Sequence, residues 1–334
     1  AGARGLAMGS AQVSSVNDAT SGYWNPAGLA EVKDHPNIGF MHAEYFAGIA
    51  KYDYGTIAIP VQDNKRTLGF SILRFAVDDI PNTLFLVEPD GSLNYNNIQT
   101  FSSADYAFLF SYGQHIRTND ERRINFGANA KVIHRKVGKF ATAWGFGLDA
   151  GLQYRTDDWQ VGIMARDIST TFNAWSFKFT DKEKEVLYLT KNEIPVRSTE
   201  MTAPRLVLGG GYHFHFGSNV SLLAEANASL TFDGKRNTVI SADPVSIDPS
   251  LGLELSVKDV FYARAGITNF QRALADEDTL NQKKVWIYQP SLGAGFHFNN
   301  VSLDYAFSNL ANQSNPLYTH IFSIRLTLAK RKDN

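Results

Sequence analysis

The sequence predicts an all-β fold, an antiparallel barrel of about fourteen strands that spans a membrane and carries a short N-terminal plug in its lumen. Three observations support this prediction. Apolar and polar residues alternate with period two along most of the chain after residue 36, as they do in strands with two different faces. Short polar turns alternate with longer connections between these segments. Residues 1–36 do not alternate and are rich in Gly and Ala.

Composition narrows the class of protein. The 334 residues carry a formal net charge of −1 and contain no Cys. The balanced charge argues against a nucleic-acid partner bound through its phosphates, and the lack of Cys excludes disulfides and thiolate metal sites. No apolar run reaches the roughly 18 residues that a membrane-spanning helix needs. A closed barrel is the remaining way to cross a bilayer, because it leaves no backbone group unpaired in lipid.

The N-terminal segment, residues 1–36, contains the turn motif Trp24-Asn25-Pro26-Ala27. Proline fixes its own φ and biases the preceding residue away from helix, so Asn25 and Pro26 favour a turn. The Asn25 side chain could hold that turn through a local hydrogen bond. We expect residues 1–36 to form a hatch, with Trp24, Asn25, Pro26 and Ala27 as its gate. The alternative is that Asn25-Pro26 is only a turn that enters the first strand.

We expect residues 37–334 to form the barrel, in a single domain together with the hatch. Alternation predicts strands at 37–46, 50–61, 66–77, 104–117, 122–137, 140–155, 157–168, 202–216, 218–232, 248–258, 259–269, 285–299, 300–309 and 318–330. One helix is predicted within a loop, at residues 181–190.

The connections sort by length. Short turns lie at 62–65, 118–121, 156–158, 217–219, 258–259 and 299–300, and the longer loops lie at 78–103, 169–201, 233–247, 270–284 and 309–317. Short turns at one end, long loops at the other and an even number of strands are typical of bacterial outer-membrane barrels. The pattern predicts a chain surrounded by outer-membrane lipid, with both termini in the periplasm.

Charged residues share the polar face of the predicted strands. Those expected to point into the lumen are Lys131, Asp149, Arg166, Glu225, Glu254, Arg264, Asp304 and Arg325. A charge facing lipid costs about 2–4 kcal/mol at mid-depth, so the lumen is the expected place for these side chains. Both signs occur, which favours ion pairs around whatever fills the interior over an ion pathway. Small residues at other inward positions, such as Gly151 and Gly293, leave room for a plug or a ligand.

Two of the predicted loops are unusually apolar. The residues concerned are Leu84, Phe85, Phe172, Trp175 and Phe177. Apolar side chains on an outer loop need cover from the barrel mouth, from other loops or from another protein. We therefore identify these five residues as candidates for a partner-binding surface, with packing among the loops as the alternative.

Catalytic and metal sites are not predicted. His213 and His215 share one strand face, but two His need a further ligand to hold a metal, and both lie near short turns. No Gly-rich phosphate loop joins a strand to a helix, and no Ser/His/Asp set can be assembled. We expect no enzyme activity, no metal and no cofactor.

The N-terminal motifs resemble a known family. Gly5-Leu6-Ala7-Met8-Gly9, Asn17-Asp18-Ala19-Thr20 and Trp24-Asn25-Pro26-Ala27-Gly28-Leu29 resemble the hatch of FadL-like outer-membrane proteins, and more closely that of the PorV/PorQ branch of Bacteroidota. The resemblance implies a fourteen-stranded barrel with the N-terminal segment folded into its lumen. PorV-like relatives are not enzymes and act in type IX secretion, where they bind the translocon and its cargo. FadL relatives pass fatty acids or other hydrophobic molecules.

Two functions follow from this resemblance. The preferred hypothesis is a PorV-like accessory of a secretion translocon, whose partner is a large outer-membrane subunit or secreted cargo. The alternative is a FadL-like passive transporter, whose partner is a hydrophobic small molecule. The first predicts a lumen blocked by the hatch, and the second predicts an apolar pocket above it. The mixed charges of the inward face favour the first.

Overall fold

The computed structural model describes residues 1–62, 64–88, 90–119, 121–194, 197–274, 284–309 and 318–328, apart from the side chains of Arg197 and Ala273. Most of the predicted loops at 270–284 and 309–317 lie outside these residues. None of the helices among the described residues is long and apolar enough to cross a membrane.

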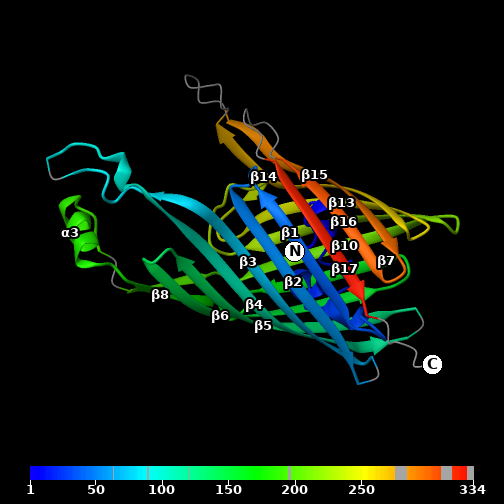
Figure 1. Cartoon of the computed structure of the whole chain (residues 1–334). Coiled ribbons are helices and arrows are strands. Elements are labelled where there is room, and N and C mark those ends of the chain that lie inside the picture. Colours follow the sequence, from blue (N-terminus) through cyan, green and yellow to red (C-terminus); the bar gives the residue numbers. More distant parts are fainter. Residues whose placement is uncertain are drawn as a thin grey trace.

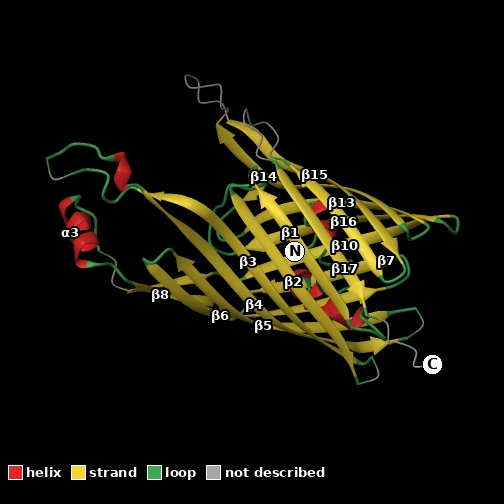
Figure 2. Ribbon diagram, in the orientation of Figure 1, coloured by secondary structure: helices red, strands yellow, loops and turns green. Residues whose placement is uncertain are grey.

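The strands form one closed antiparallel barrel (Figures 1 and 2). Within the described residues they are β1 (Asn37–Tyr45), β2 (Ala50–Val61), β3 (Arg66–Asn82), β4 (Gln99–Thr118), β5 (Arg123–Val137), β6 (Ala141–Arg155), β7 (Trp159–Arg166), β8 (Thr171–Phe177), β9 (Arg197–Thr202), β10 (Arg205–Phe216), β11 (Val220–Thr231), β12 (Ile240–Ser241), β13 (Ser246–Val257), β14 (Phe261–Leu274), β15 (Lys284–Phe298), β16 (Val301–Ser308) and β17 (Thr319–Thr327). The last strand, β17, pairs with β1 and closes the ring.

These elements build a wall of 14 strands. β7 and β8 are two pieces of one strand, because both pair with β6. β9 and β10 are likewise two pieces, which pair with β8 and β7 respectively. The two-residue β12 pairs only with the start of β13 and adds no strand to the wall. The predicted fold class, an all-β barrel of about fourteen antiparallel strands, is therefore confirmed.

One predicted loop is wrong in part. Residues 171–177 are strand β8, and β9 continues the wall at residues 197–202. The prediction failed because apolar residues occupy both faces of β8. Phe172 is exposed on the outside, whereas Trp175 pairs with the inward-facing Ala143, so the sequence does not alternate. β3 and β4 also extend into the predicted loop at 78–103.

Helices occur in the N-terminal segment and in the long loops (Figure 2). They are α1 (Ala3–Ala7), α2 (Ser21–Trp24), the 3-10 helices η1 (Pro26–Glu31) and η2 (Tyr95–Asn97), and α3 (Asp181–Leu189). α3 matches the helix predicted at 181–190. Its N-terminus is fixed by a capping box, in which the Thr180 side chain accepts from the Glu183 amide and Glu183 accepts from the Thr180 amide. Lys139, on the β5–β6 turn, pairs with Glu183 at 2.8 Å.

The two faces of the wall differ in polarity as the alternation predicts. On β6, Asp149 and Gln153 face inward and are buried, whereas Trp144 and Phe146 face outward and are 53% and 63% exposed. A belt of exposed aromatic and aliphatic side chains would be unfavourable in water and is the surface that lipid covers.

Polar side chains lie at one edge of this apolar belt, at the end of the barrel that carries the long loops. On the outer face, Asp53 lies 2.7 Å from the ring Nδ1 of His42 and accepts a 2.9 Å hydrogen bond from Arg74. At the opposite end, beside short turns, the rings of Trp159 and Phe214 each contact Tyr212 at 4.7 Å between centroids. Charged pairs and aromatic rings at these two levels are what the two membrane interfaces favour.

We predict that Phe146→Arg prevents stable insertion, because an arginine on the lipid face costs about 2–4 kcal/mol near mid-depth. Tyr188→Arg is the matched control, since Tyr188 is 77% exposed on α3, outside the wall. The fraction of each variant that folds into lipid vesicles, measured by its heat-dependent shift in gel mobility, should fall for Phe146→Arg alone. Equal folding of both variants would contradict the assignment of the lipid face.

Candidate functional site

The N-terminal segment lies inside the barrel (Figure 1) and contacts the inner face of several strands. Its residues Gly9, Val13 and Pro26 approach inward-facing glycines on strands far apart in the ring: Gly266 on β14, Gly162 on β7 and Gly127 on β5. Almost all of the segment is buried, including its polar residues Gln12, Ser14 and Asn25.

Glycine is required at these wall positions because main chain meets main chain. A Cβ added to Gly127 would lie 2.1 Å from the carbonyl carbon of Pro26, and one added to Gly266 would lie 2.0 Å from the amide nitrogen of Gly9. Both distances are far below a van der Waals contact, so neither position tolerates a side chain unless the segment moves. The sequence signal for this packing is glycine on the inward face of an otherwise regular strand.

The predicted gate residues fix the segment to itself and to the wall. Asn25 Oδ1 accepts from the Ala27 amide at 3.1 Å and so caps η1. Its Nδ2 donates to the carbonyl oxygens of Val13 at 2.9 Å and of Leu152, on β6, at 3.1 Å. Trp24 Nε1 donates to the carbonyl oxygen of Ala1 at 2.6 Å. Asn25-Pro26 is therefore a capped turn that is also bonded to β6.

We predict that Gly127→Ala lowers stability by about 1–3 kcal/mol, the usual cost of overpacking a well-packed interior. Gly210→Ala is the control, because a Cβ there would meet only the Gln160 carbonyl oxygen, at 3.9 Å. The midpoint of guanidinium unfolding in detergent micelles should fall for Gly127→Ala only. Proteolysis of residues 1–36 should accelerate in the same variant, and unchanged rates would contradict the close contact.

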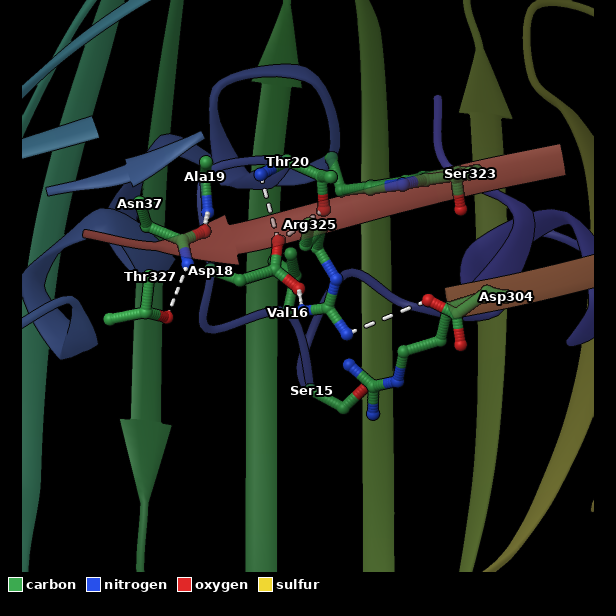
Figure 3. Close-up of polar contacts among 12 residues, drawn as sticks. Ser15, Val16, Asp18, Ala19, Thr20, Asn37, Asp304, Ser323, Arg325 and Thr327 are labelled. Atoms are coloured by element: carbon green, nitrogen blue, oxygen red, sulfur yellow. Dashed lines mark hydrogen bonds and ion pairs between the residues drawn. The ribbon is translucent and has the colours of Figure 1, made fainter. Parts of the chain in front are cut away.

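A chain of ion pairs joins the segment to the wall, and Figure 3 shows its part from Asp18 through Arg325 to Asp304. Its contacts are Arg4–Glu254 at 2.8 Å, Glu254–Arg264 at 2.6 Å, Arg264–Asp304 at 2.7 Å, Asp304–Arg325 at 3.6 Å and Arg325–Asp18. We call these six residues the ion-pair chain. Arg4 and Asp18 come from the segment, and the other four come from β13, β14, β16 and β17. Three positive and three negative groups alternate along it, so no charge is left uncompensated.

The other predicted lumen charges form separate contacts. Lys131 pairs with Asp149 at 2.7 Å and with Asp167 at 2.5 Å. Arg166 donates to the Tyr23 carbonyl oxygen at 2.8 Å and lies 5.0 Å from the Tyr23 ring centroid. Glu225 accepts from the Ser14 amide at 2.8 Å. The structure thus brings together four of the eight predicted charges in one chain and binds the rest to other partners.

Three members of these networks are not predicted by the sequence. Arg4 and Asp18 belong to a segment without alternation, so no pattern assigned them a direction. Asp167 lies in the break between β7 and β8, at a positive φ of 55°. Nothing in the sequence beyond the acidic residue itself indicates that this break turns Asp167 towards Lys131.

Burial by itself raises the pKa of the Asp18 carboxyl, but Arg325 and the Thr20 hydroxyl outweigh burial and hold this pKa below its ordinary value of 3.8. A carboxyl with a lowered folded pKa stabilises the fold above its unfolded pKa. That contribution is lost as the pH falls from 3.8 through the lowered folded pKa.

We predict that Asp18→Asn destabilises the protein near neutral pH, that its difference from wild type begins to shrink as the pH falls below about 3.8, and that it disappears below the lowered folded pKa. Asp157→Asn, on an exposed turn, is the control and should show little difference at any pH. Unfolding free energies measured by Trp fluorescence across this range test the prediction. A difference that persists unchanged in acid would show that the Asp18 charge does not stabilise the fold.

An aromatic cluster lies on the inner face of the wall towards the long-loop end. It comprises Tyr23, Tyr45, Tyr52, Tyr54 and Phe75, whose rings lie 6.0–6.4 Å apart in the contacting pairs. Tyr23 comes from α2, and the others come from β1, β2 and β3. Phe75 is 39% exposed although it shares the inward face of β3 with the buried Leu73. The cluster therefore presents an apolar surface to the interior.

The five predicted loop residues do not form one surface. Leu84 and Phe85 are partly buried in the β3–β4 loop, and Phe172 faces outward from β8. Trp175 faces inward, where Arg135 lies 5.0 Å from its ring and Glu200 accepts from its Nε1 at 3.1 Å. Phe177 stacks against Trp175. The loop prediction is corrected accordingly, because three of the five residues belong to the wall.

Besides a hollow of about 580 Å³ lined by residues such as Arg74, Tyr106 and Lys136, three hollows among the described residues are large enough to hold a small molecule. Two are apolar grooves of about 710 and 630 Å³ on the outer face of the wall, lined mainly by residues such as Phe40 and Leu303 or Tyr212 and Leu251. The third is a polar cavity of about 420 Å³ on the inner side at the short-turn end, which we call the polar cavity. Among the described residues there is no group of three or more His, Asp or Glu side chains placed to hold a metal ion.

Comparison with known proteins shows the fold. No protein-family model matches the sequence, and no curated protein matches it. The CymD monoaromatic hydrocarbon channel is 13% identical, with a TM-score of 0.59 over 100% of this chain and 98% of that chain. The P. putida toluene transporter TodX is 10% identical, with a TM-score of 0.59 over 99% of each chain. A Pseudomonas aeruginosa FadL homologue is 14% identical, with a TM-score of 0.52 over 98% of each chain.

The chain therefore has the fold of FadL-like outer-membrane barrels over its whole length. This fold fits a place in the outer membrane. The three proteins are channels, transporters or their homologues rather than enzymes. None of the three is described as a PorV-like protein, so the comparisons show a FadL-like fold and do not show that branch.

Proposed function

We propose that this protein is a passive outer-membrane transporter of small hydrophobic molecules. The sequence favours a PorV-like secretion accessory, whereas the comparisons favour this alternative, because structures of the same fold are described as a monoaromatic hydrocarbon channel and a toluene transporter. The observation that carries the proposal within this chain is the aromatic cluster inside the barrel, formed where an apolar molecule entering from the long-loop end would meet the wall.

The cluster suits a small apolar ligand for two reasons. Its rings meet edge to face or at a tilt, with interplanar angles of 59° to 71° between Tyr45, Tyr52 and Phe75. Another aromatic ring packs favourably in such an arrangement. The part-exposed Phe75 ring also leaves apolar surface available.

In this proposal residues 1–36 act as the plug of the transporter, with Asn25 and Pro26 holding it on the wall and both chain termini on the periplasmic side. Passage then requires either a movement of the plug or an exit through the wall. The break between β7 and β8 at residues 167–170 is the place where β6 loses its regular pairing. It is the position in the wall that we propose for such an exit.

We predict that Phe75→Ala lowers the initial rate of toluene uptake about two- to tenfold, as expected for the loss of one aromatic contact. Phe110→Ala makes the same change on the outward face of β4, where Phe110 is 55% exposed, and serves as the control. Uptake of radiolabelled toluene by cells that produce each variant at equal surface levels checks the prediction.

Uptake that matches cells without the protein would refute the transporter proposal. Equal losses in both variants would refute the role of the aromatic cluster while leaving transport itself intact.

A protein partner is the second candidate function, supported by apolar side chains at the long-loop end. Val87 and Tyr95 in the β3–β4 loop and Tyr188 on α3 are 62%, 68% and 77% exposed. Exposed apolar residues of this kind favour contact with another protein. Purification of the tagged native protein in mild detergent, followed by mass spectrometry, tests this candidate. A partner retained in proportion to the barrel, and lost with Tyr188→Asp, would support it.

A further inference from the structure

The polar cavity contains an arginine that forms no ion pair within 4 Å with any of the described residues. Arg155, at the end of β6, is only 8% exposed and lines this cavity of about 420 Å³. Its Nη1 donates to the Val16 carbonyl oxygen at 3.2 Å, and its Nη2 donates to that of Ser15 at 3.5 Å. A guanidinium has five N–H donors, so more than half of them have no protein acceptor within the described residues.

The nearby acids already have partners. Glu31 accepts from Asn125 at 2.8 Å and lies 3.6 Å from Arg123. The other buried carboxylates of the cavity lining are Asp18, Glu254 and Asp304, and all three belong to the ion-pair chain. Asp259 also lines the cavity, but it lies on an exposed turn and accepts from Ser256. Among the residues described, Arg155 therefore has no carboxylate within ion-pair distance, and Glu31 is the acid that acts most strongly on its charge.

A second group points to the same ligand. Ser15 is 2% exposed, lines the cavity, and its hydroxyl oxygen has no hydrogen-bond partner among the described residues. Ser15 also supplies the carbonyl oxygen that accepts from Arg155. Figure 3 shows Ser15 next to Val16 on the N-terminal segment, on the same side as Asp18 and Arg325. A hydroxyl group without a partner, on a residue bonded to a guanidinium that keeps three further N–H donors, is a donor set for an anion.

We propose that the polar cavity binds a small organic carboxylate through Arg155 and the Ser15 hydroxyl. The planar guanidinium matches both oxygens of a carboxylate, which favours this anion over a spherical one. The volume lies within the range of about 300–1,000 Å³ that is usual for small-molecule sites. This inference rests on the proposed function, because it names acids as a class of small molecule that the transporter handles.

The cavity is separate from the aromatic cluster. Asn37 lines the cavity and Tyr45 belongs to the cluster, and these residues are the two ends of β1. Eight residues of strand place the two sites about 26 Å apart, with the N-terminal segment between them. A molecule that meets the cluster from the long-loop side would thus reach the carboxylate site only beyond that segment.

Binding of benzoate to the full-length protein in lipid nanodiscs, measured by calorimetry, tests the proposal. Arg155→Gln should weaken binding by about tenfold or more, because it removes a charged hydrogen-bond donor from a buried site. Arg155→Lys keeps the positive charge but lacks the paired N–H donors of the guanidinium, and it should weaken benzoate binding less than Arg155→Gln does. Ser15→Ala should weaken benzoate binding about two- to fivefold. Arg117→Gln, exposed on β4, is the control for overall charge and should change nothing.

Benzoate affinity that is equal in wild type and Arg155→Gln, or an absence of benzoate binding, would overturn the proposal. Competition by inorganic phosphate as strong as that by acetate would overturn the preference for a carboxylate. If Arg155→Gln fails to fold, an unchanged affinity for benzoate in both Arg155→Lys and Ser15→Ala would also overturn the proposal. Toluene uptake by cells tests the transporter separately, so the failure of either claim can be told from the failure of the other.

Discussion

The interior depends on pairing charges that have been removed from water. Burying a charge is unfavourable unless opposite charges and hydrogen bonds compensate it. The alternation of Arg4, Glu254, Arg264, Asp304, Arg325 and Asp18 provides that compensation. Both ends of the chain of contacts belong to the N-terminal segment. If the segment left, Glu254 would lose Arg4 and Arg325 would lose Asp18, and each would keep one partner on the wall. These two ion pairs therefore help to hold the segment in place.

Shape acts together with charge. The wall offers glycine where the backbone of the segment comes closest, as at Gly127 and Gly266, and larger polar side chains elsewhere. Ion pairs favour one orientation of the segment but tolerate small shifts in its position. A contact between its backbone and a glycine of the wall tolerates almost no shift. The combination makes the segment part of the folded core of the barrel rather than a loosely held insert.

This arrangement divides the interior chemically. The aromatic rings of Tyr45, Tyr52 and Phe75 lie towards the long loops, and the polar cavity with Arg155 lies towards the short turns. A molecule with an apolar body and an acidic head would find a suited surface on each side. The ion-pair chain lines the polar cavity, at one end of the interior. A lumen of mixed charge is therefore compatible with an apolar surface at the other end.

The sequence by itself determined the fold class, the number of strands in the wall and the face of each regular strand, because period-two alternation is a local consequence of a wall between lipid and a polar interior. It also identified Glu254, Arg264, Asp304 and Arg325 as inward charges. It did not reveal β8, where both faces are apolar, or the direction of Asp167 in a strand break. Pairing of Arg4 and Asp18 with the wall, and the lack of a carboxylate partner for Arg155, were decided by the tertiary structure alone. These features depend on which residues of distant strands meet around the N-terminal segment, and no local pattern encodes that.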